Sequence, residues 1–435
     1  MSEANRTWQN WARSVVVTPR RVERPSSTEE LQQAVKRAVA AGQRVKAVGA
    51  GHSFTGIAAA PDVLLELENL QGIIDVDAQR GRVKFHAGTR LHRIPVLLAG
   101  HHLAMPNLGD IDRQSLAGAI STGTHGTGAG FGGLATQVVG LTLVQPDGGL
   151  LTIADDDPLL PAAALGLGAL GILADITVQC VPGFALRAEE SSELLADTLD
   201  TLALRVESAD HFEFYWFPHT DRAATKSNTR LPGTVPLQPR SPVQRWLDES
   251  LLSNSVFRAT CAAGTAVPAL IPTVNRTAAR LLGGRQYTEV SHRVFTQRRT
   301  VRFREMEYGL PAGRLEAAFT ALRQLVEDHG WRISFPVEVR WAAADNRWLS
   351  TAHGRDSAYI AVHRYYREEY REYFDAVEEI MLAHGGRPHW GKLHSLDAAA
   401  LGSRYPHFDD FLAVRNRLDP DRVFSNDYLD RVLGP

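Results

Sequence analysis

The pattern of apolar and polar positions over residues 1–183 predicts short strands separated by loops and a few helices. Apolar residues three to four positions apart predict a helix over residues 27–42, which starts with Ser and Thr and ends at glycine. Strands are expected at 44–49 and 63–69, and hairpins at 72–88 and 141–153 turn at Arg-Gly and Asp-Gly. A short helix is expected at 89–102. Because this order lacks a regular βαβ rhythm, it indicates an α+β fold.

After residue 183 the pattern changes to aromatic strands and amphipathic helices. Strands are predicted at 211–218, 335–343 and 358–366, and helices at 313–330 and 367–386. The segment 230–242, rich in Pro and Gly, is expected to be an exposed loop, and 266–284 a helix facing the core. Because 435 residues exceed one comfortable core, we expect two domains, the second a sheet covered by helices.

Composition and charge exclude several classes of protein. The net charge is -2, which gives no electrostatic reason to expect a nucleic acid partner. The two cysteines form neither a disulfide framework nor a CxxC pair. The first residues contain no apolar secretion signal, so we expect a cytoplasmic protein. Residues 161–181 are interrupted by Gly and Asp, and contact with a membrane is not expected.

Two glycine-rich segments are the first candidates for a binding site. The segment VKAVGAGHSFTG (45–56) is a strand followed by a glycine turn with His52 at its tip, and residues 109–133 are crowded with Gly, Ser and Thr. Loops without Cβ atoms let backbone N–H groups converge on an anion such as phosphate. Neither segment is a G-x-G-x-x-G or Walker motif. The loops could hold an extended dinucleotide, or they could be tight turns packed on neighbouring strands.

Charged side chains in the second half are candidates for chemistry. Alternation in SFPVEVRWA places Glu338 and Arg340 opposite an apolar face of Phe335, Val337, Val339 and Trp341. The pair faces either solvent or a cleft. By the same rule Ala361, His363 and Tyr365 share a face. Lys392 is one of only five lysines and lies in the loop GGRPHWGKLH, where it is either a tuned ammonium or a solvated surface group.

Five motifs in order resemble the sugar-lactone and alditol oxidoreductases of the vanillyl-alcohol-oxidase flavoprotein family. They are AVGAGHSFT, SLAGAISTGTHGTG, LGALGILADIT, FPVEVRW and PHWGKLH, with DPDRVFSNDYL near the C-terminus. The resemblance implies an α+β, two-domain FAD-binding fold of the p-cresol-methylhydroxylase type. It places the FAD-binding domain at residues 1–183, the substrate (cap) domain at 184–410, and a returning segment at 411–435. A flavin carrier without turnover, or a non-flavin enzyme on this scaffold, fits the retained motifs less well.

The resemblance also assigns the cofactor site. His52 would carry FAD covalently through the flavin 8α-methyl carbon, and a neutral imidazole nitrogen is a competent nucleophile for that bond. No metal is expected. The other residues implied to contact the cofactor are Gly49, Ala50, Gly51, Ser53, Ser115, Gly118, Thr122, Thr124, His125, Gly126, Ile172 and His389.

The implied reaction is oxidation of a small polyhydroxylated substrate by hydride transfer to flavin N5. Glu338, Arg340 and Lys392 would be catalytic, with Arg340 fixing a substrate oxygen, Glu338 orienting Arg340, and Lys392 lowering the pKa of the hydroxyl or assisting its deprotonation. Asp110 and His363 would bind the substrate. The favoured substrate is an aldono-1,4-lactone oxidised at C2, and an alditol oxidised at C1 or another furanose alcohol such as a nucleoside stays open. O2, a quinone or a protein would reoxidise the flavin.

Overall fold

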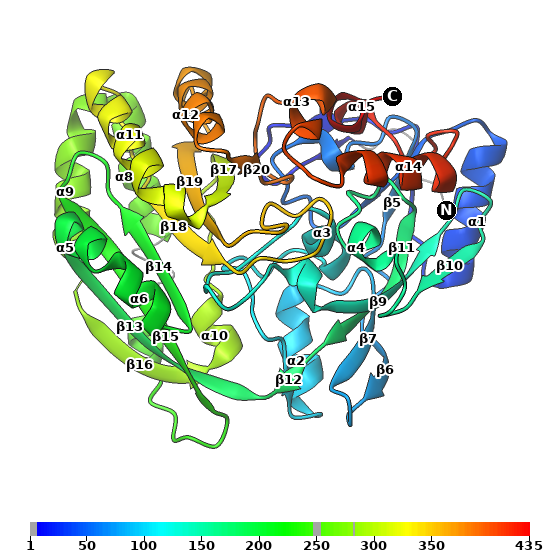
Figure 1. Cartoon of the computed structure of the whole chain (residues 1–435), viewed down its shortest axis with the longest axis horizontal. Helices are drawn as coiled ribbons and strands as arrows, with labels where there is room; N and C mark the ends of the chain where they lie inside the picture. Colours follow the sequence, from blue (N-terminus) through cyan, green and yellow to red (C-terminus); the bar gives the residue numbers. More distant parts are fainter. Residues whose placement is uncertain (1–6, 247–253, 282) are drawn as a thin grey trace.

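The structure, a computed structural model, describes residues 7–246, 254–281 and 283–435. Two halves lie side by side, each built on its own sheets (Figure 1). The chain begins in one half, passes into the other at β13 and returns near its end. Both termini therefore lie in the same half (Figure 1).

The first half contains two principal sheets. The antiparallel sheet has the order β10-β9-β11-β7-β6 and consists of β6 (Ile73–Asp77), β7 (Arg82–His86), β9 (Val138–Val144), β10 (Leu150–Ile153) and β11 (Ile172–Gln179). A parallel sheet has the order β3-β5-β4 and consists of β3 (Arg21–Glu23), β4 (Val45–Val48) and β5 (Val63–Glu66). Two short pairs complete it: β1 (Trp8–Gln9) with β2 (Val16–Val17), and β8 (Leu103–Ala104) with β12 (Val181–Pro182).

The helices of the first half share one core with these sheets. Near the N-terminus are α1 (Thr28–Ala40), α2 (Ile94–Ala99), α3 (Leu116–Ser121) and α4 (Leu160–Ala163). The C-terminal helices α13 (Ala398–Gly402), α14 (Phe408–Leu418) and α15 (Asp427–Leu433) contribute to the same core. The backbone N–H of Val45 donates to the carbonyl of Val423 at 2.7 Å, which joins the end of the chain to the strand before the first glycine loop.

Helix α1 forms where the sequence predicted it. The Ser27 side chain caps its N-terminus by accepting from the backbone N–H of Glu30. Leu31, Val35 and Ala38 lie on its buried face. The predicted hairpins are also confirmed, as β6 with β7 and β9 with β10. The helix expected at 89–102 is confirmed as the 3₁₀ turn Leu91–Arg93 followed by α2.

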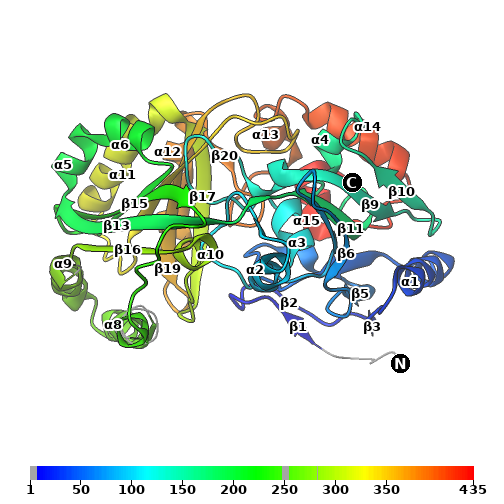
Figure 2. The same cartoon turned by 90° about the horizontal axis from the view of Figure 1, so that it is seen from below.

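The second half is an antiparallel sheet of eight strands in the order β16-β13-β15-β14-β18-β19-β17-β20. Its strands are β13 (Phe184–Leu194), β14 (His211–Trp216), β15 (Arg222–Pro232), β16 (Arg285–Val290), β17 (Phe303–Pro311), β18 (Val337–Ala342), β19 (Ser357–Tyr365) and β20 (Arg387–Pro388). One face is covered by α5 (Leu195–Asp200), α6 (Leu202–Ser208), α11 (Leu315–Asp328) and α12 (Arg371–Ala383). On the opposite side lie α8 (Phe257–Ala266) and α9 (Ile271–Leu281) (Figure 2). The shorter α7 (Pro242–Trp246) and α10 (Ser291–Phe295) complete this half.

The alternation of β18 decides which side chains face the first half. Val337, Val339 and Trp341 belong to the core under α11 and α12, and Glu338 and Arg340 project to the other face. Both charged residues are only 7% exposed, so the pair lies in a cleft and not in solvent. On β19, Ala358, Ile360 and Val362 enter the same core, and His363 therefore faces the cleft as predicted.

Two sequence-based predictions for this half concern Phe335 and the helix within residues 266–284. Phe335 was assigned to the apolar face of β18, but it precedes the strand and packs in a separate cluster with Phe54 and Phe303, because alternation begins only at Val337. The helix expected within 266–284 is confirmed as α9, which buries Ile271, Asn275 and Ala279. Among the described residues, no helix is long and apolar enough to cross a membrane.

Candidate active site

The first glycine loop leaves β4 and lies directly against the start of α3. Gly51 has a φ of 66°, a backbone conformation that glycine adopts without strain. A Cβ atom on Gly49 would lie 2.0 Å from Ser115 Oγ, so only glycine fits there. Ser115 uses the same oxygen to accept from the backbone N–H of Gly118 at the N-terminus of α3. The two glycine-rich segments therefore form one cradle.

Three adjoining cavities lead from this cradle to the second half. The loop cavity lies between the two glycine loops and residues 166–173; the junction cavity lies where the halves meet; the cap cavity lies under α8 and α9. The loop and junction cavities share His52, Ser53, Gln114 and Thr122. The junction and cap cavities share Asp110, Ile111, Arg340 and Lys392. An elongated cofactor and its substrate could thus meet at the junction.

Most of the predicted residues line these cavities. Gly126 lines none of the three, because it packs against the carbonyl of Leu108, where a Cβ would come within 2.3 Å. The loop cavity is lined by Gly49, Ala50, Gly51, His52, Ser53, Ser115, Gly118, Thr122 and Ile172. The junction cavity adds Asp110, Thr124, His125, Arg340, His389 and Lys392. The cap cavity contains Asp110, Glu338, Arg340, His363 and Lys392.

His52 stands at the border of the loop and junction cavities as a neutral ring. Burial, together with the positive charges of Arg90 and Lys392, lowers the pKa of His52 to about 4. Trp11 stacks on the imidazole with 5.6 Å between ring centroids and fixes its orientation. At neutral pH one ring nitrogen is therefore unprotonated and available as a nucleophile. Trp11 and Gln114 were not predicted: Trp11 lies outside both glycine-rich segments, and Gln114 lies in the second one but is not one of its Gly, Ser or Thr residues.

Arg340 is the centre of a charged cluster at the border with the cap cavity. Its Nε donates to Glu213 at 2.9 Å, and its terminal nitrogens contact Glu338 and lie 3.6 Å from Asp110. Arg299, a residue that sequence reasoning missed, donates to Asp110 at 2.9 Å. Although burial opposes it, Arg299 and then Arg340 and Lys392 hold the pKa of Asp110 well below its usual range.

Glu338 differs from the other carboxylates of this cluster. Burial raises the pKa of Glu338 to about 7, and Asp110 and Glu213 add to the rise while Arg340 opposes it. The Tyr215 hydroxyl donates to Glu338 Oε1 at 3.2 Å. Glu338 can therefore change its protonation state close to neutral pH, which is the property a proton-exchanging group needs.

Lys392 is paired with two glutamates that the sequence did not single out. Its Nζ lies 2.5 Å from Glu305 and 3.9 Å from Glu307, which project from the same face of β17. Although burial opposes it, Glu305 and then Glu307 raise the pKa of Lys392. Lys392 is therefore a stable ammonium, which favours the predicted role of lowering the pKa of a substrate hydroxyl over that of a free base.

The two glutamates extend this pair into a chain of polar contacts. His363 lies between the carbonyl of Pro336 at 3.2 Å and Glu305 at 3.5 Å. His125 lies in the same way between the carbonyl of Gly126 at 2.8 Å and Glu307 at 3.1 Å. His363 lines the cap cavity and His125 the junction cavity, so the chain joins the two.

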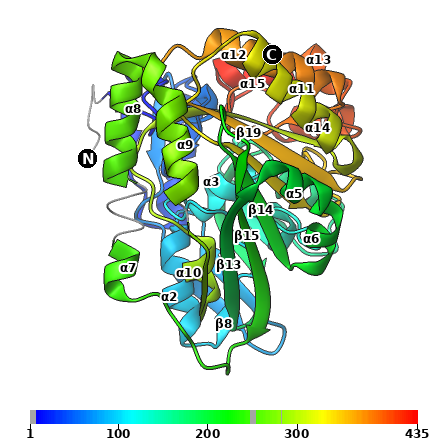
Figure 3. The same cartoon turned by 90° about the vertical axis from the view of Figure 1, so that its left-hand side faces the viewer.

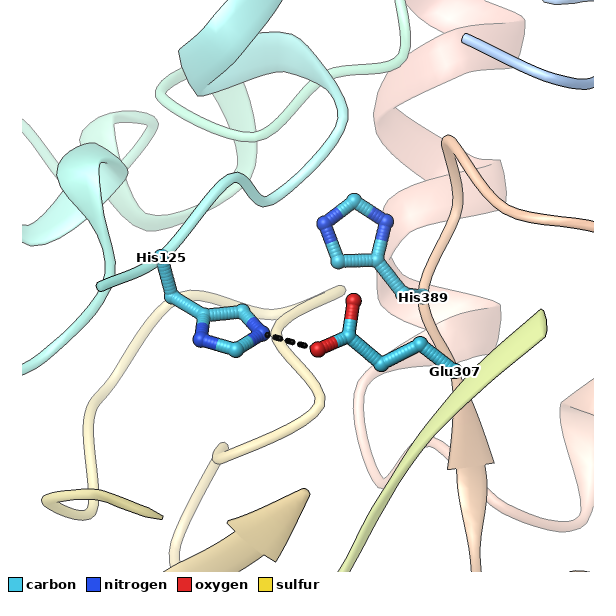
Figure 4. Close-up of side chains that lie close together, drawn as sticks. All are labelled: His125, Glu307 and His389. Atoms are coloured by element: carbon cyan, nitrogen blue, oxygen red, sulfur yellow. Dashed lines mark ion pairs between the residues drawn. The ribbon is translucent and has the colours of Figure 1, made fainter. Parts of the chain in front are cut away.

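His125, Glu307 and His389 also meet as a buried trio with ligand atoms within 4.8 Å of one another (Figure 4). His389 Nδ1 accepts from the backbone N–H of Gly391 at 3.0 Å, and burial lowers the pKa of His389 to about 4. The neutral ring must then carry its proton on Nε2, which leaves that nitrogen without a lone pair for a cation. The trio is thus a contact between His125 and the Glu307 carboxylate beside a neutral histidine.

Comparison with known families identifies the class of the protein and then its family. The model of the FAD binding domain matches residues 19–154, which include both glycine loops, and together with the oxidase family match and the relatives below it shows that the chain is an FAD-dependent oxidoreductase. The model described as D-arabinono-1,4-lactone oxidase matches residues 176–432. The chain belongs to this family.

Full-length relatives and a solved structure support the assignment. The chain is 42% identical to L-gulono-1,4-lactone dehydrogenase of Mycobacterium tuberculosis (strain ATCC 25618 / H37Rv), covering 98% of this chain and 99% of the relative. It is 32% identical to L-gulonolactone oxidase of Bos taurus and 32% identical to alditol oxidase of Streptomyces sp. (strain IKD472 / FERM P-14339), with 98% of each chain covered. The fold matches cholesterol oxidase from Brevibacterium sterolicum with a TM-score of 0.84 at 18% identity, over 100% of this chain and 97% of that one.

The residues present fit FAD. The position of Gly49, where a Cβ would clash, lets two loop backbones come together, and the N-terminus of α3 faces the same cavity. The loop cavity can hold the dinucleotide portion and the junction cavity the ring system, with His52 between them. When bound, the flavin supplies a two-electron acceptor.

Proposed function

We propose that this protein oxidises an aldono-1,4-lactone at C2, with FAD bound by the first half, which comprises residues 1–183 and the C-terminal segment from α13 onward, and the substrate held by the eight-stranded sheet of the second half. The observation that carries the proposal is the charged cluster of Asp110, Arg340 and Lys392, which the junction and cap cavities share. A substrate bound there has its reacting carbon beside the flavin site. The names of the relatives provide the substrate class.

Each residue of the cluster has a role that its contacts support. The Arg340 and Lys392 cations bind the oxygen of the reacting hydroxyl and stabilise negative charge as its proton leaves. Glu338 holds Arg340 and accepts from another substrate hydroxyl. Asp110 and His363, which both line the cap cavity, contact the remaining hydroxyl groups.

The hydroxyl proton needs an acceptor, and Glu305 is in place for it. Although burial opposes it, Lys392 and then His363 lower the pKa of Glu305 in the resting site, so the carboxylate takes a proton only as part of a relay: Lys392 gives one of its protons to Glu305 across 2.5 Å as it receives the proton of the substrate hydroxyl. Lys392 ends as an ammonium again and Glu305 ends as a carboxylic acid. The proton is thereby moved away from the reacting oxygen.

We also propose that FAD is attached covalently through His52. The support is the neutral, oriented imidazole at the border of the loop and junction cavities. A tether at this point would keep the ring system in the junction cavity during turnover.

The deciding experiment measures the turnover of the purified, FAD-loaded protein with ferricyanide as acceptor. The substrates are L-gulono-1,4-lactone, D-arabinono-1,4-lactone, xylitol and a nucleoside. We expect turnover with a lactone and conversion of that lactone to its 2-keto product. Preference for xylitol would move the protein to the alditol branch, which the 32% identical alditol oxidase makes the second candidate. A flavin-loaded protein that oxidises none of the four would contradict the proposal.

A further inference from the structure

The cap cavity is larger than the charged cluster at its inner end. It has a volume of about 500 Å³ and continues outward between α8 and α9, which lie side by side over it (Figure 3). We call this outer part the outer chamber. It is lined by the apolar side chains of Val256, Phe257, Ile271, Val274 and Ala278, together with the polar side chains of Thr260, Thr273, Asn275 and Thr277.

Aromatic rings separate the charged end from the outer chamber. Phe257 and Phe335 meet edge to face at 4.7 Å, and Phe335 lies 5.6 Å from Phe303. All three line the cap cavity. Such rings offer stacking surfaces to a flat ligand and few hydrogen-bonding groups.

A sugar lactone does not match this outer part. Nearly every carbon of the lactone carries an oxygen, and a hydroxyl group buried against apolar walls without a hydrogen-bond partner is destabilising. Cavities of this volume usually hold ligands well above the size of one sugar ring. The charged end satisfies the lactone, and the outer chamber is left for an apolar occupant.

We propose that the outer chamber binds the second substrate, a hydrophobic quinone that accepts the electrons. The proposal rests on the proposed function, because it needs a first substrate that donates two electrons. The flat ring would lie against the packed cluster of Phe257, Phe303 and Phe335, and a quinone oxygen would reach the N–H donors of Arg340 and Lys392. An apolar tail would lie against Val274 and Ile271 on α9.

A quinone in the outer chamber reaches the flavin site through the charged end of the cap cavity, where the lactone also binds. The cap and junction cavities share Arg340 and Lys392, so a molecule in the outer chamber has a path to the flavin site only through the charged end. Lactone and quinone would bind there in turn. A charged acceptor protein is too large for this route, and O2 does not require an apolar chamber.

Oxidation of the lactone and reduction of the quinone balance in electrons and protons. The lactone loses two electrons and two protons when its C2 hydroxyl becomes a carbonyl. The quinone gains two electrons and two protons when it becomes a hydroquinone. The proton stored on Glu305 returns through Lys392 to one quinone oxygen, and bound FAD would supply the other hydrogen together with the two electrons taken from the lactone.

The entrance of the chamber is suited to an apolar molecule. Val256 at the start of α8, and Val267 and Leu270 between α8 and α9, are 43%, 49% and 46% exposed. Val256 lines the cap cavity and gives it an exposed apolar side chain, whereas Val267 and Leu270 lie at the other end of α8, outside the cavity lining.

The experiment compares two acceptors on the FAD-loaded enzyme: decylubiquinone, and ferricyanide as a small hydrophilic control. Val274→Trp and Thr277→Trp fill the chamber from α9; Thr277 is exposed and tolerates a larger side chain. Ala262→Trp on α8 is the matched control, because Ala262 is exposed and lies outside the cavity. We expect the ratio of kcat/KM for decylubiquinone to that for ferricyanide to fall at least tenfold in the first two variants and to stay unchanged in the control. Decylubiquinone should also compete with the lactone.

Direct binding separates this inference from the proposed function. Decylubiquinone should raise the melting temperature of the native protein and of Ala262→Trp, but not of Val274→Trp. If no lactone is oxidised with either acceptor and this pattern remains, the chamber is a quinone site and the proposed substrate is wrong. An unchanged acceptor ratio in both filled variants would overturn the quinone site. A rise in the KM for lactone alone would also overturn it, since the chamber would then hold part of the sugar substrate.

Discussion

Lys392 Nζ lies 2.5 Å from Glu305 Oε2, and this contact joins the cap cavity to the chain of charges behind it. Glu305 is paired directly with His363 in the register of β17 and β19, so one carboxylate contacts both a lysine and a histidine of the cavity wall. The pair keeps Lys392 protonated while giving it a neighbour that can take a proton. A binding cation thereby also becomes a proton carrier.

Glu305→Gln should slow the chemical step more than substrate binding. The amide cannot take the proton, and loss of the carboxylate lowers the pKa of Lys392. We expect kcat to fall by about 10²-fold or more, the usual effect of losing an acid–base group, with a smaller change in KM for the lactone. The pH at which kcat changes should also be lower in Glu305→Gln than in the native enzyme, because Lys392 then loses its proton at a lower pH.

Glu189→Gln is the control for this substitution, because Glu189 is an exposed carboxylate on strand β13 of the same sheet. It should leave kcat and its pH profile unchanged. A Glu305→Gln enzyme that folds, binds FAD and keeps the native kcat would show that the proton leaves by another path.

Glu338 predicts how activity depends on pH. The carboxyl group must be ionised to hold Arg340 and to accept from the substrate, and its pKa is raised to about 7, so the required form is lost as the pH falls through that value. Log kcat/KM should therefore rise with a slope of about one below pH 7 and level off above it. In Glu338→Gln this limb should disappear while the overall rate falls. A native profile that is flat from pH 5 to 8 would contradict the assignment.

His52→Ala tests the covalent link. Flavin absorption should remain with the native chain after denaturation in SDS and be released as free FAD from the variant, because the nucleophilic ring is gone. His101→Ala is a suitable control, since His101 is exposed and outside all three cavities. If FAD leaves the denatured native protein as well, the cofactor is bound without a tether.

Part of this site could be predicted from local sequence. Period-two alternation in VEVRWA placed Glu338 and Arg340 on one face, and glycine spacing located both loops. The partners of these residues could not be predicted in the same way. The register aligns Tyr215, Glu338, Ala361 and Glu307 across four strands, and it depends on the strand order β14-β18-β19-β17. Nothing in a single strand encodes that order.

Arg299 was missed for a related reason. It lies in an irregular segment between α10 and β17, where no periodicity indicates the direction of a side chain. Only the tertiary fold brings it to Asp110, 189 positions earlier in the chain. Phe335 shows the opposite error: the alternation was extended two residues beyond the start of β18, into a segment that lines the cap cavity.

Gly49→Ala should abolish FAD binding with little effect on the rest of the fold. The new methyl group would lie 2.0 Å from Ser115 Oγ, so either the first loop or the capping hydroxyl of α3 has to move, and both line the loop cavity. We expect the FAD content of the purified variant to fall at least tenfold and its melting temperature to approach that of the native apoprotein. Gly100→Ala is the matched control, because a Cβ there meets nothing within 4 Å and its φ of -66° suits alanine. Native FAD content in Gly49→Ala would mean that the cofactor does not depend on the close approach of the two loops.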